Sequence, residues 1–190
     1  IMALDDTATV VPAVGQYWFH SEVGTPPPTD VDDPGADGYE HLGHTALEEP
    51  FALTSEGGEE TVLGTWQNPQ LRTVNSPRVE SVAFVLQQWT EETYRLYYGA
   101  NATQDANGYV MVPEHPIKVQ GALFVLIRDG EERLPLWFPR VEIYRADDIT
   151  ADSEALMGLP VRATILGRSG QTGLYGIAPK TQGGSSPTSP

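Results

Sequence analysis

The residues that could carry chemistry in this chain are few and poorly grouped. His41 and His44 form a pair in the segment EHLGH, and a pair of histidines can bind zinc. A zinc site needs at least a third ligand, usually at helical or tight-turn spacing. Gly43 between the two histidines argues against a helix. We therefore interpret this segment as a structural loop and expect no metal site.

The acidic side chains form no catalytic or ion-binding pattern. The run from Asp30 to Asp37 superficially resembles a calcium loop, but Pro34 interrupts the alternation of oxygen ligands that calcium needs. Glu91 and Glu92 are adjacent, so on a helix their side chains point apart and make poor acid–base partners. We interpret these carboxylates as solvated surface charge.

Nucleophilic chemistry is also unsupported. Ser169 lies in a Gly-Arg-Ser-Gly segment that lacks the strand–turn–helix context of an exposed catalytic serine. The chain contains no cysteine, which excludes disulfides, thiolate catalysis and thiolate metal sites. We expect no enzymatic activity and no cofactor.

Positive charge is missing from the first third of the chain. No Lys or Arg precedes Arg72, whereas residues 1–71 contain thirteen Asp and Glu, a net charge near −13. The remaining residues hold all eleven bases against thirteen acids, near −2, which together give the total of −15. Tight nucleic-acid binding needs cations that neutralise phosphates, so this balance argues against it. A long field of one sign repels polyanions.

The composition predicts a loop-rich β protein. Hydrophobic residues make up 39% of the chain, and 19 Gly with 16 Pro are typical of strands joined by turns and loops rather than of a helical bundle. No apolar run approaches the roughly 18 residues of a membrane-spanning helix, so we expect no membrane association. The strand-like segments are 9–14, 17–20, 39–42, 51–53, 61–66, 79–89, 109–112, 117–127, 134–138, 141–145, 161–166 and 174–177.

Two segments are the most strongly patterned. Residues 79–89 alternate in polarity, with an apolar face at Val82, Phe84 and Leu86, and residues 122–127 (ALFVLI) form a fully apolar strand for the core. Asp129-Gly130 then predicts a tight turn into the next strand.

One short helix follows the first of these strands. Thr90 is a good N-cap, acidic residues fill the first turn, and Gly99 is a natural stop. We expect the helix to pack on the sheet through a bulky face drawn from Tyr94, Leu96, Tyr97 and Tyr98. The predicted fold is an antiparallel β-sandwich or barrel flanked by one short α-helix.

The chain is predicted to form one domain over residues 1–178. Residues 24–38 and 54–76 are expected to be long loops or arms, because their Gly, Pro and acidic residues are too polar to pack; around Gly57-Gly58 and Asn68-Pro69 an extended hairpin or a long loop is expected. Residues 179–190 form a Gly/Ser/Pro-rich tail that we expect to be disordered.

A series of short motifs lies between Tyr39 and Gly99. In order they are Gly-His-Thr (43–45), Glu-Gly-Gly-Glu (56–59), Leu-Gly-Thr-Trp-Gln (63–67), Leu-Arg-Thr (71–73), Leu-Gln-Gln-Trp (86–89) and Tyr-Arg-Leu-Tyr-Tyr-Gly (94–99). This order and spacing resemble the major tail proteins, or tail tube proteins, of long non-contractile-tailed phages of actinobacteria. The resemblance covers most of residues 3–178, and Gly158-Leu159-Pro160-Val161 fits it too.

The resemblance implies a structural virion protein that forms hexameric rings, which stack into the tail tube through which DNA passes without specific binding. It implies the tape measure protein and tail terminator or tail-tip proteins as partners, assembly in the host cytoplasm and no catalytic residues. Our candidates for inter-subunit or inter-ring contacts are Asp32, Asp33, His44, Glu56, Glu59, Trp66 and Arg72. For a negatively charged lumen the candidates are Glu80 and Glu114.

The alternative is a monomeric β-sandwich that serves as a binding or adhesion module. Such a module would expose an aromatic platform and stay monomeric at high concentration. The edge strands of a sandwich otherwise need protection, which a ring provides by pairing them between subunits.

Overall fold

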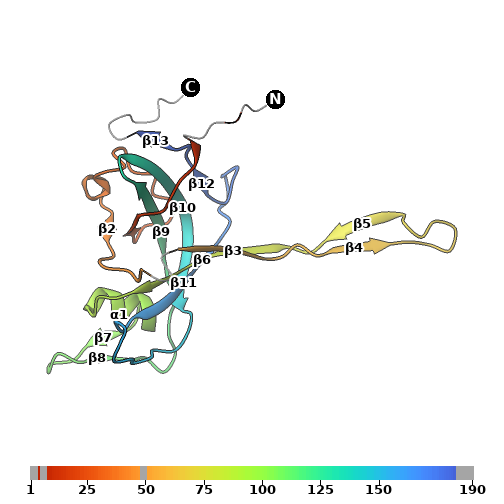
Figure 1. The fold of residues 1–190 in the computed structure, drawn as a ribbon. Helices are drawn as coiled ribbons and strands as arrows, with labels where there is room; N and C mark the ends of the chain where they lie inside the picture. Colours follow the sequence, from red (N-terminus) through yellow and green to blue (C-terminus); the bar gives the residue numbers. More distant parts are fainter. Residues whose placement is uncertain (1–3, 5–7, 48–50, 183–190) are drawn as a thin grey trace.

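A computed structural model describes residues 4, 8–47 and 51–182 of the chain. Its main feature is a nine-stranded antiparallel sheet in which β2-β1-β9-β10-β11-β6-β3 are neighbours and β12 and β13 pair along β10 (Figure 1). The strands of this sheet are β1 (Val14–His20), β2 (Glu40–His41), β3 (Ala52–Gly57), β6 (Arg78–Leu86), β9 (Val119–Asp129), β10 (Glu132–Arg145), β11 (Leu159–Ile165), β12 (Gly176–Ile177) and β13 (Thr181–Gln182). Two further two-stranded sheets are formed by β4 (Glu60–Leu63) with β5 (Arg72–Asn75), and by β7 (Thr103–Gln104) with β8 (Val110–Met111).

The large sheet folds over on itself. Tyr17 on β1 stacks on Phe84 of β6, with ring centroids 4.4 Å apart, although three strands separate β1 from β6 in the sheet. The register of β10 against β9 shifts between Phe138 and Val141, and this irregularity lets the long strand bend. The predicted mainly β, antiparallel and sandwich-like fold is therefore confirmed, although the strand ladder does not close into a barrel.

The core lies between the two folded halves of the sheet. β9 is buried on both faces from Ala122 to Leu126, as its continuous apolar run predicts. β6 instead alternates, and its apolar side chains Val82, Phe84 and Leu86 join the main core cluster. The opposite face of β9 carries Phe124 and Leu126 in a second, smaller cluster.

Helix α1 (Glu91–Tyr98) follows β6 and begins and ends where the sequence predicts. The Thr90 hydroxyl accepts from the Thr93 amide, and the Thr93 hydroxyl accepts from the Thr90 amide at 3.0 Å, which forms a capping box. Gly99 ends the helix with a φ of 114°, a value that favours glycine.

Several strand boundaries differ from the prediction. β1 runs through Gly15, which pairs with Ile127 in the ladder, because a paired neighbour outweighs the weak strand propensity of glycine. β10 is one strand rather than two, since Pro139 lies at the bulge, where no ladder hydrogen bond is required of it. Asp129 pairs with Glu132, so the tight turn is centred one residue later than Asp129-Gly130.

The expectation that residues 24–38 are too polar to pack is wrong. This segment, which we call the covering loop, lies on the outer cluster formed by Tyr39 and by Phe124 and its neighbours on β9. Pro28 and Pro34 are buried, and Pro34 opens a short 3-10 helix, η2 (Pro34–Asp37). Its prolines supply apolar surface that the polar composition conceals, so the loop protects a sheet face that would otherwise be exposed.

A projecting ribbon as the candidate assembly site

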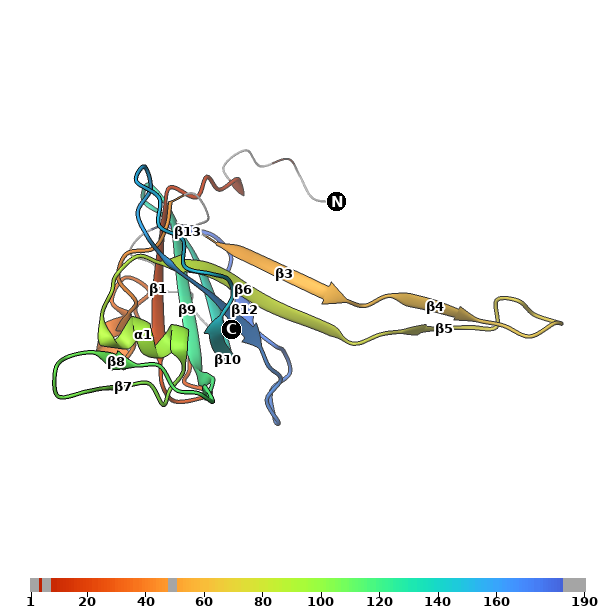
Figure 2. The same cartoon turned by 90° about the horizontal axis from the view of Figure 1, so that it is seen from below.

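The most unusual feature of the molecule is a ribbon that extends far from its body (Figures 1 and 2). β3 and β6 pair from Ala52 and Ala83 out to Gly57 and Arg78. The chain then continues as β4 and β5, which pair only with each other in the described structure. The extended hairpin is one of the two forms expected for this region, and we call residues 58–76 the ribbon.

The ribbon exposes apolar side chains that lie outside both core clusters of the described residues. Val62 lies on one face, and Leu63 and Val74 lie on the other, because neighbouring strand residues point to opposite faces. Trp66, at the tip, is 99% exposed. An isolated two-stranded ribbon is only marginally stable in water, and exposed apolar patches mark interaction sites. The ribbon therefore has the properties of a segment that another molecule covers.

The tip of the ribbon has a defined turn. The amides of Thr65 and Asn68 donate to each other's carbonyl oxygens at 2.8 and 3.1 Å. Gly64 lies so close to Pro69 that an added Cβ would sit 2.1 Å from the Pro69 carbonyl oxygen. This turn fixes the direction in which Trp66 leaves the ribbon.

Four predicted contact residues lie along this projection. Arg72 and Trp66 are on the outer part, where all side chains are exposed. Glu59 lies at the base, where its amide donates to Ser76 Oγ at 2.9 Å. Glu56, on β3, forms an exposed ion pair of 3.5 Å with Arg162 of β11. Glu59, Trp66 and Arg72 thus lie on the ribbon, whereas Glu56 lies on β3 next to its base.

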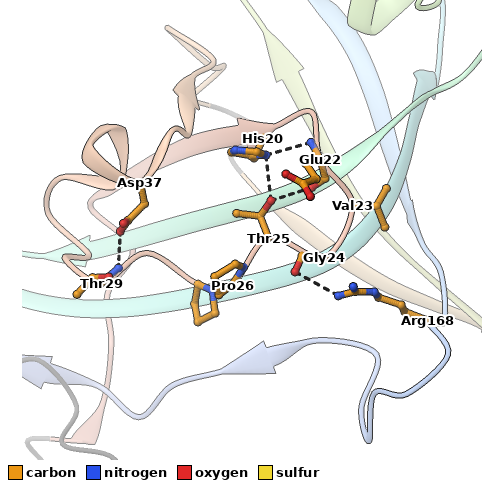
Figure 3. Close-up of a pocket in the computed structure, with 10 residues that line it drawn as sticks. His20, Glu22, Val23, Gly24, Thr25, Pro26, Thr29, Asp37 and Arg168 are labelled. Carbon is orange, nitrogen blue, oxygen red and sulfur yellow. Dashed lines mark hydrogen bonds between the residues drawn. The ribbon is translucent and has the colours of Figure 1, made fainter.

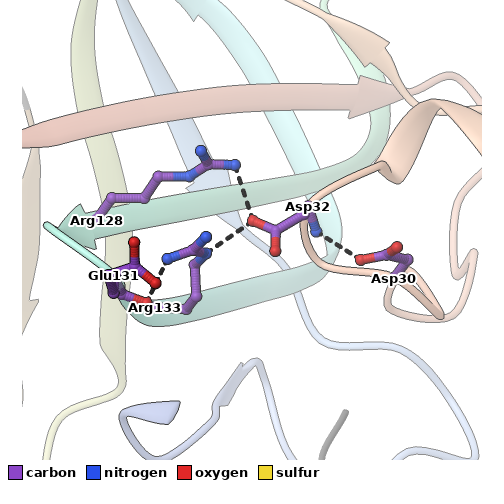
Figure 4. Close-up of polar contacts among 5 residues, drawn as sticks. All are labelled: Asp30, Asp32, Arg128, Glu131 and Arg133. Atoms are coloured by element: carbon purple, nitrogen blue, oxygen red, sulfur yellow. Dashed lines mark hydrogen bonds and ion pairs between the residues drawn. The ribbon is translucent and has the colours of Figure 1, made fainter. Parts of the chain in front are cut away.

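Asp32 has a role within the subunit that sequence reasoning missed. Its Oδ1 accepts from Arg128 Nη2 at 2.9 Å and from Arg133 Nε at 2.7 Å, so it joins the covering loop to the β9–β10 hairpin (Figure 4). Asp30 Oδ1 in turn accepts from the Asp32 amide at 2.9 Å. Asp33 is exposed beside this cluster. No sequence signal connects Asp32 with arginines about one hundred positions away.

A small pocket of about 370 Å³ lies between the covering loop and Arg168 (Figure 3). His20 Nδ1 accepts from the Glu22 amide at 3.0 Å and lies 3.0 Å from the Thr25 hydroxyl, which also lies 2.9 Å from the Glu22 carbonyl oxygen. Because Nδ1 already accepts an amide hydrogen, it is a poor base for activating the hydroxyl. Arg168 donates to the Gly24 carbonyl oxygen at 3.2 Å. These contacts shape the loop.

His41 and His44 line a groove of about 500 Å³ beside the start of β1, which we call the β1 groove. His41 Nδ1 accepts from the Gly43 amide at 2.9 Å, and the ring packs edge-on against Trp18. Burial, and next the neighbouring His44, lowers the pKa of His41. The described residues hold no group of three side chains placed to bind a metal ion.

The two lumen candidates occupy different settings. Glu80 lies half-buried on β6, and its hydrogen bond with Tyr175 raises the pKa of that tyrosine. Glu114 is exposed in the loop between β8 and β9. Glu114 is therefore the more solvent-exposed of the two carboxylates in a single subunit.

Comparison with known proteins identifies the family of this chain. Residues 2–184 match the family described as phage tail tube protein, and the chain belongs to this family. It is 33% identical over 177 residues to the major tail protein Gp23 of Mycobacterium phage D29, covering 87% of this chain and 88% of the relative. It is 32% identical over 177 residues, with the same coverage, to the major tail protein Gp23 of Mycobacterium phage L5. Among the described residues, no helix is long and apolar enough to cross a membrane.

Proposed function

We propose that the protein assembles into hexameric rings that stack to form the tail tube of a virion, and that DNA passes through this tube during genome ejection. The projecting ribbon is the observation that carries the proposal. Its exposed apolar side chains need a partner, and a second copy of the chain supplies one when each subunit covers the ribbon of the next. A contact of this kind between different surfaces closes into a ring and can repeat along an axis.

The family supports the remaining parts of this proposal. We propose that the protein, as a member of the tail tube family, acts in the virion tail, has the tape measure protein and the tail terminator or tail-tip proteins as partners, and assembles in the host cytoplasm. Of the predicted contact residues, Trp66 and Arg72 on the ribbon serve inter-subunit contacts, and Asp33 and His44 remain exposed for them. The ribbon gains order when a neighbouring subunit covers it.

The charge of the chain fits a conduit for DNA. With a net charge of −15, the subunits give the tube wall a negative field, and Glu114 and Glu80 are our lumen candidates. Duplex DNA carries one negative charge per about 1.7 Å, so a basic wall would hold it through many phosphate contacts. A negative wall repels it over roughly 8–10 Å at physiological salt. A structure of the tube with a net positive lumen would overturn this part of the proposal.

Shortening the ribbon tests the assembly. Gly57 pairs with Arg78, so replacing residues 58–77 by Asn-Gly leaves a two-residue hairpin turn between paired strands. We expect this variant to unfold at the same denaturant midpoint as the full chain, since the core is untouched, but to form no tubes in electron micrographs. A full chain that stays monomeric at high concentration would favour the alternative, a monomeric binding or adhesion module.

A further inference from the structure

A further pocket, on the outer face of the sheet, has a volume and a lining that suit an aromatic side chain. It has a volume of about 520 Å³ and lies between the covering loop and β10. We call it the outer pocket. Its lining residues are mainly apolar: Pro27, Pro28, Thr29, Val31, Phe124, Pro135, Trp137, Gly176, Ile177 and Ala178.

The walls of the outer pocket are held in place within the subunit. The Trp137 indole donates to the Thr25 carbonyl oxygen at 3.0 Å, and the Tyr39 hydroxyl donates to the Pro26 carbonyl oxygen at 2.9 Å. Asp32, on the same loop, is bound to Arg128 and Arg133 of the β9–β10 hairpin. The pocket is therefore largely formed before any partner arrives, which lowers the entropic cost of binding.

Trp66 is the exposed aromatic side chain that the outer pocket could bury. It is 99% exposed at the tip of the ribbon, and tryptophan buries a large apolar surface when it fills a pocket. From Gly57 to Trp66 there are nine residues, which span about 30 Å at roughly 3.3 Å per strand residue. That length equals the diameter of a small domain, so the tip extends away from its own subunit and can reach a neighbouring one (Figure 1).

Charge distinguishes the outer pocket from the β1 groove as the place where Trp66 binds. Residues 64–72 at the tip contain Arg72 and no acid, whereas the covering loop contains four aspartates and no base. Two arginines, Arg128 and Arg133, contact Asp32, so the covering loop together with these two partners carries about −2 (four acids less two bases). The described lining of the β1 groove contains no carboxylate. Electrostatic complementarity of this kind fixes register and suppresses wrong partners.

We propose that Trp66 of one copy occupies the outer pocket of the next copy, with Arg72 beside the acidic covering loop. This inference rests on the proposed function and names the two surfaces that meet. Trp66 then acts as an anchor at the centre of the contact, where a few aromatic side chains typically dominate the binding energy.

Thiol cross-linking tests the contact, because the chain has no cysteine of its own. Gln67→Cys places a thiol next to Trp66, and Thr29→Cys places one on the pocket; both positions are exposed, so the fold is kept. We expect a short bis-maleimide to link assembled double variants into a ladder of oligomers on a denaturing gel. The matched control, Gln67→Cys with Leu47→Cys in the β1 groove, should give no ladder.

Trp66→Ala supplies a second readout. Loss of such an anchor should raise the critical concentration for assembly by about 30-fold or more. Tubes that form without a ladder, a ladder with Leu47→Cys instead, or an unchanged critical concentration in Trp66→Ala would each overturn the inference and leave the proposed function standing. Failure of the unmodified chain to assemble would overturn the proposed function itself.

Discussion

Helix α1 offers the sharpest test of how the subunit is held together. Tyr97 is 2% exposed and packs in the main core, and its hydroxyl donates to the Asp147 carbonyl oxygen at 2.7 Å. Tyr97→Ala removes a buried aromatic ring, which typically costs about 3–5 kcal/mol. Tyr97→Phe removes only the hydrogen bond, worth about 1 kcal/mol. A domain whose total stability is roughly 5–15 kcal/mol should show both changes clearly.

The assay is urea unfolding followed by circular dichroism, at concentrations too low for assembly. We expect Leu96→Ala to lower the free energy of unfolding by about 2–5 kcal/mol, because Leu96 is also buried. Tyr94→Ala is the matched control, since its side chain is only half-buried and the loss should be smaller. Changes below about 1 kcal/mol for both Tyr97→Ala and Leu96→Ala would refute the packing of α1 against the core.

Three further predictions concern the covering loop and the β1 groove. Asp32→Asn should lower the free energy of unfolding by about 1 kcal/mol, because it weakens two partly exposed ion pairs. An unchanged urea midpoint would contradict a stabilising role for Asp32. Tyr39→Phe should also cost about 1 kcal/mol through the lost bond to Pro26, and spectroscopic titration of the parent should find the pKa of Tyr39 raised by burial to about 12. Burial lowers the pKa of His41 below its ordinary 6.5, so the unfolded chain binds more protons just below that pH and stability should fall as the pH drops; His41→Gln should flatten this slope.

Much of the fold could be predicted from local pattern. The alternation around Phe84, the apolar run before Ile127 and the Thr90 cap each specify their element through nearest neighbours alone, so the structure retains them. The continuity of β1 through Gly15 could not be predicted, because it depends on a partner strand more than one hundred residues away. The bend of β10 and the folding over of the sheet are long-range in the same sense.

The candidate site, too, could be predicted from the sequence only in part. The sequence predicts a β-prone segment over residues 61–66 within a stretch rich in turn residues, and in the structure Val62 and Trp66 of that segment are exposed. The second strand of the ribbon, which carries Val74, was not predicted. The packing of residues 24–38 was missed because counting aspartates hides the apolar contribution of prolines. The role of Asp32 was missed because its arginine partners are distant in sequence.

The bond between Asp32 and the β9–β10 hairpin has a mechanical consequence. In a tube built as proposed, the covering loop receives the ribbon of a neighbouring subunit. Tension on that ribbon passes through Asp32 into Arg128 and Arg133, at the end of the two longest strands of the sheet. Those strands carry load along rows of backbone hydrogen bonds, so a tail that bends distributes the force across each subunit rather than peeling away a surface loop.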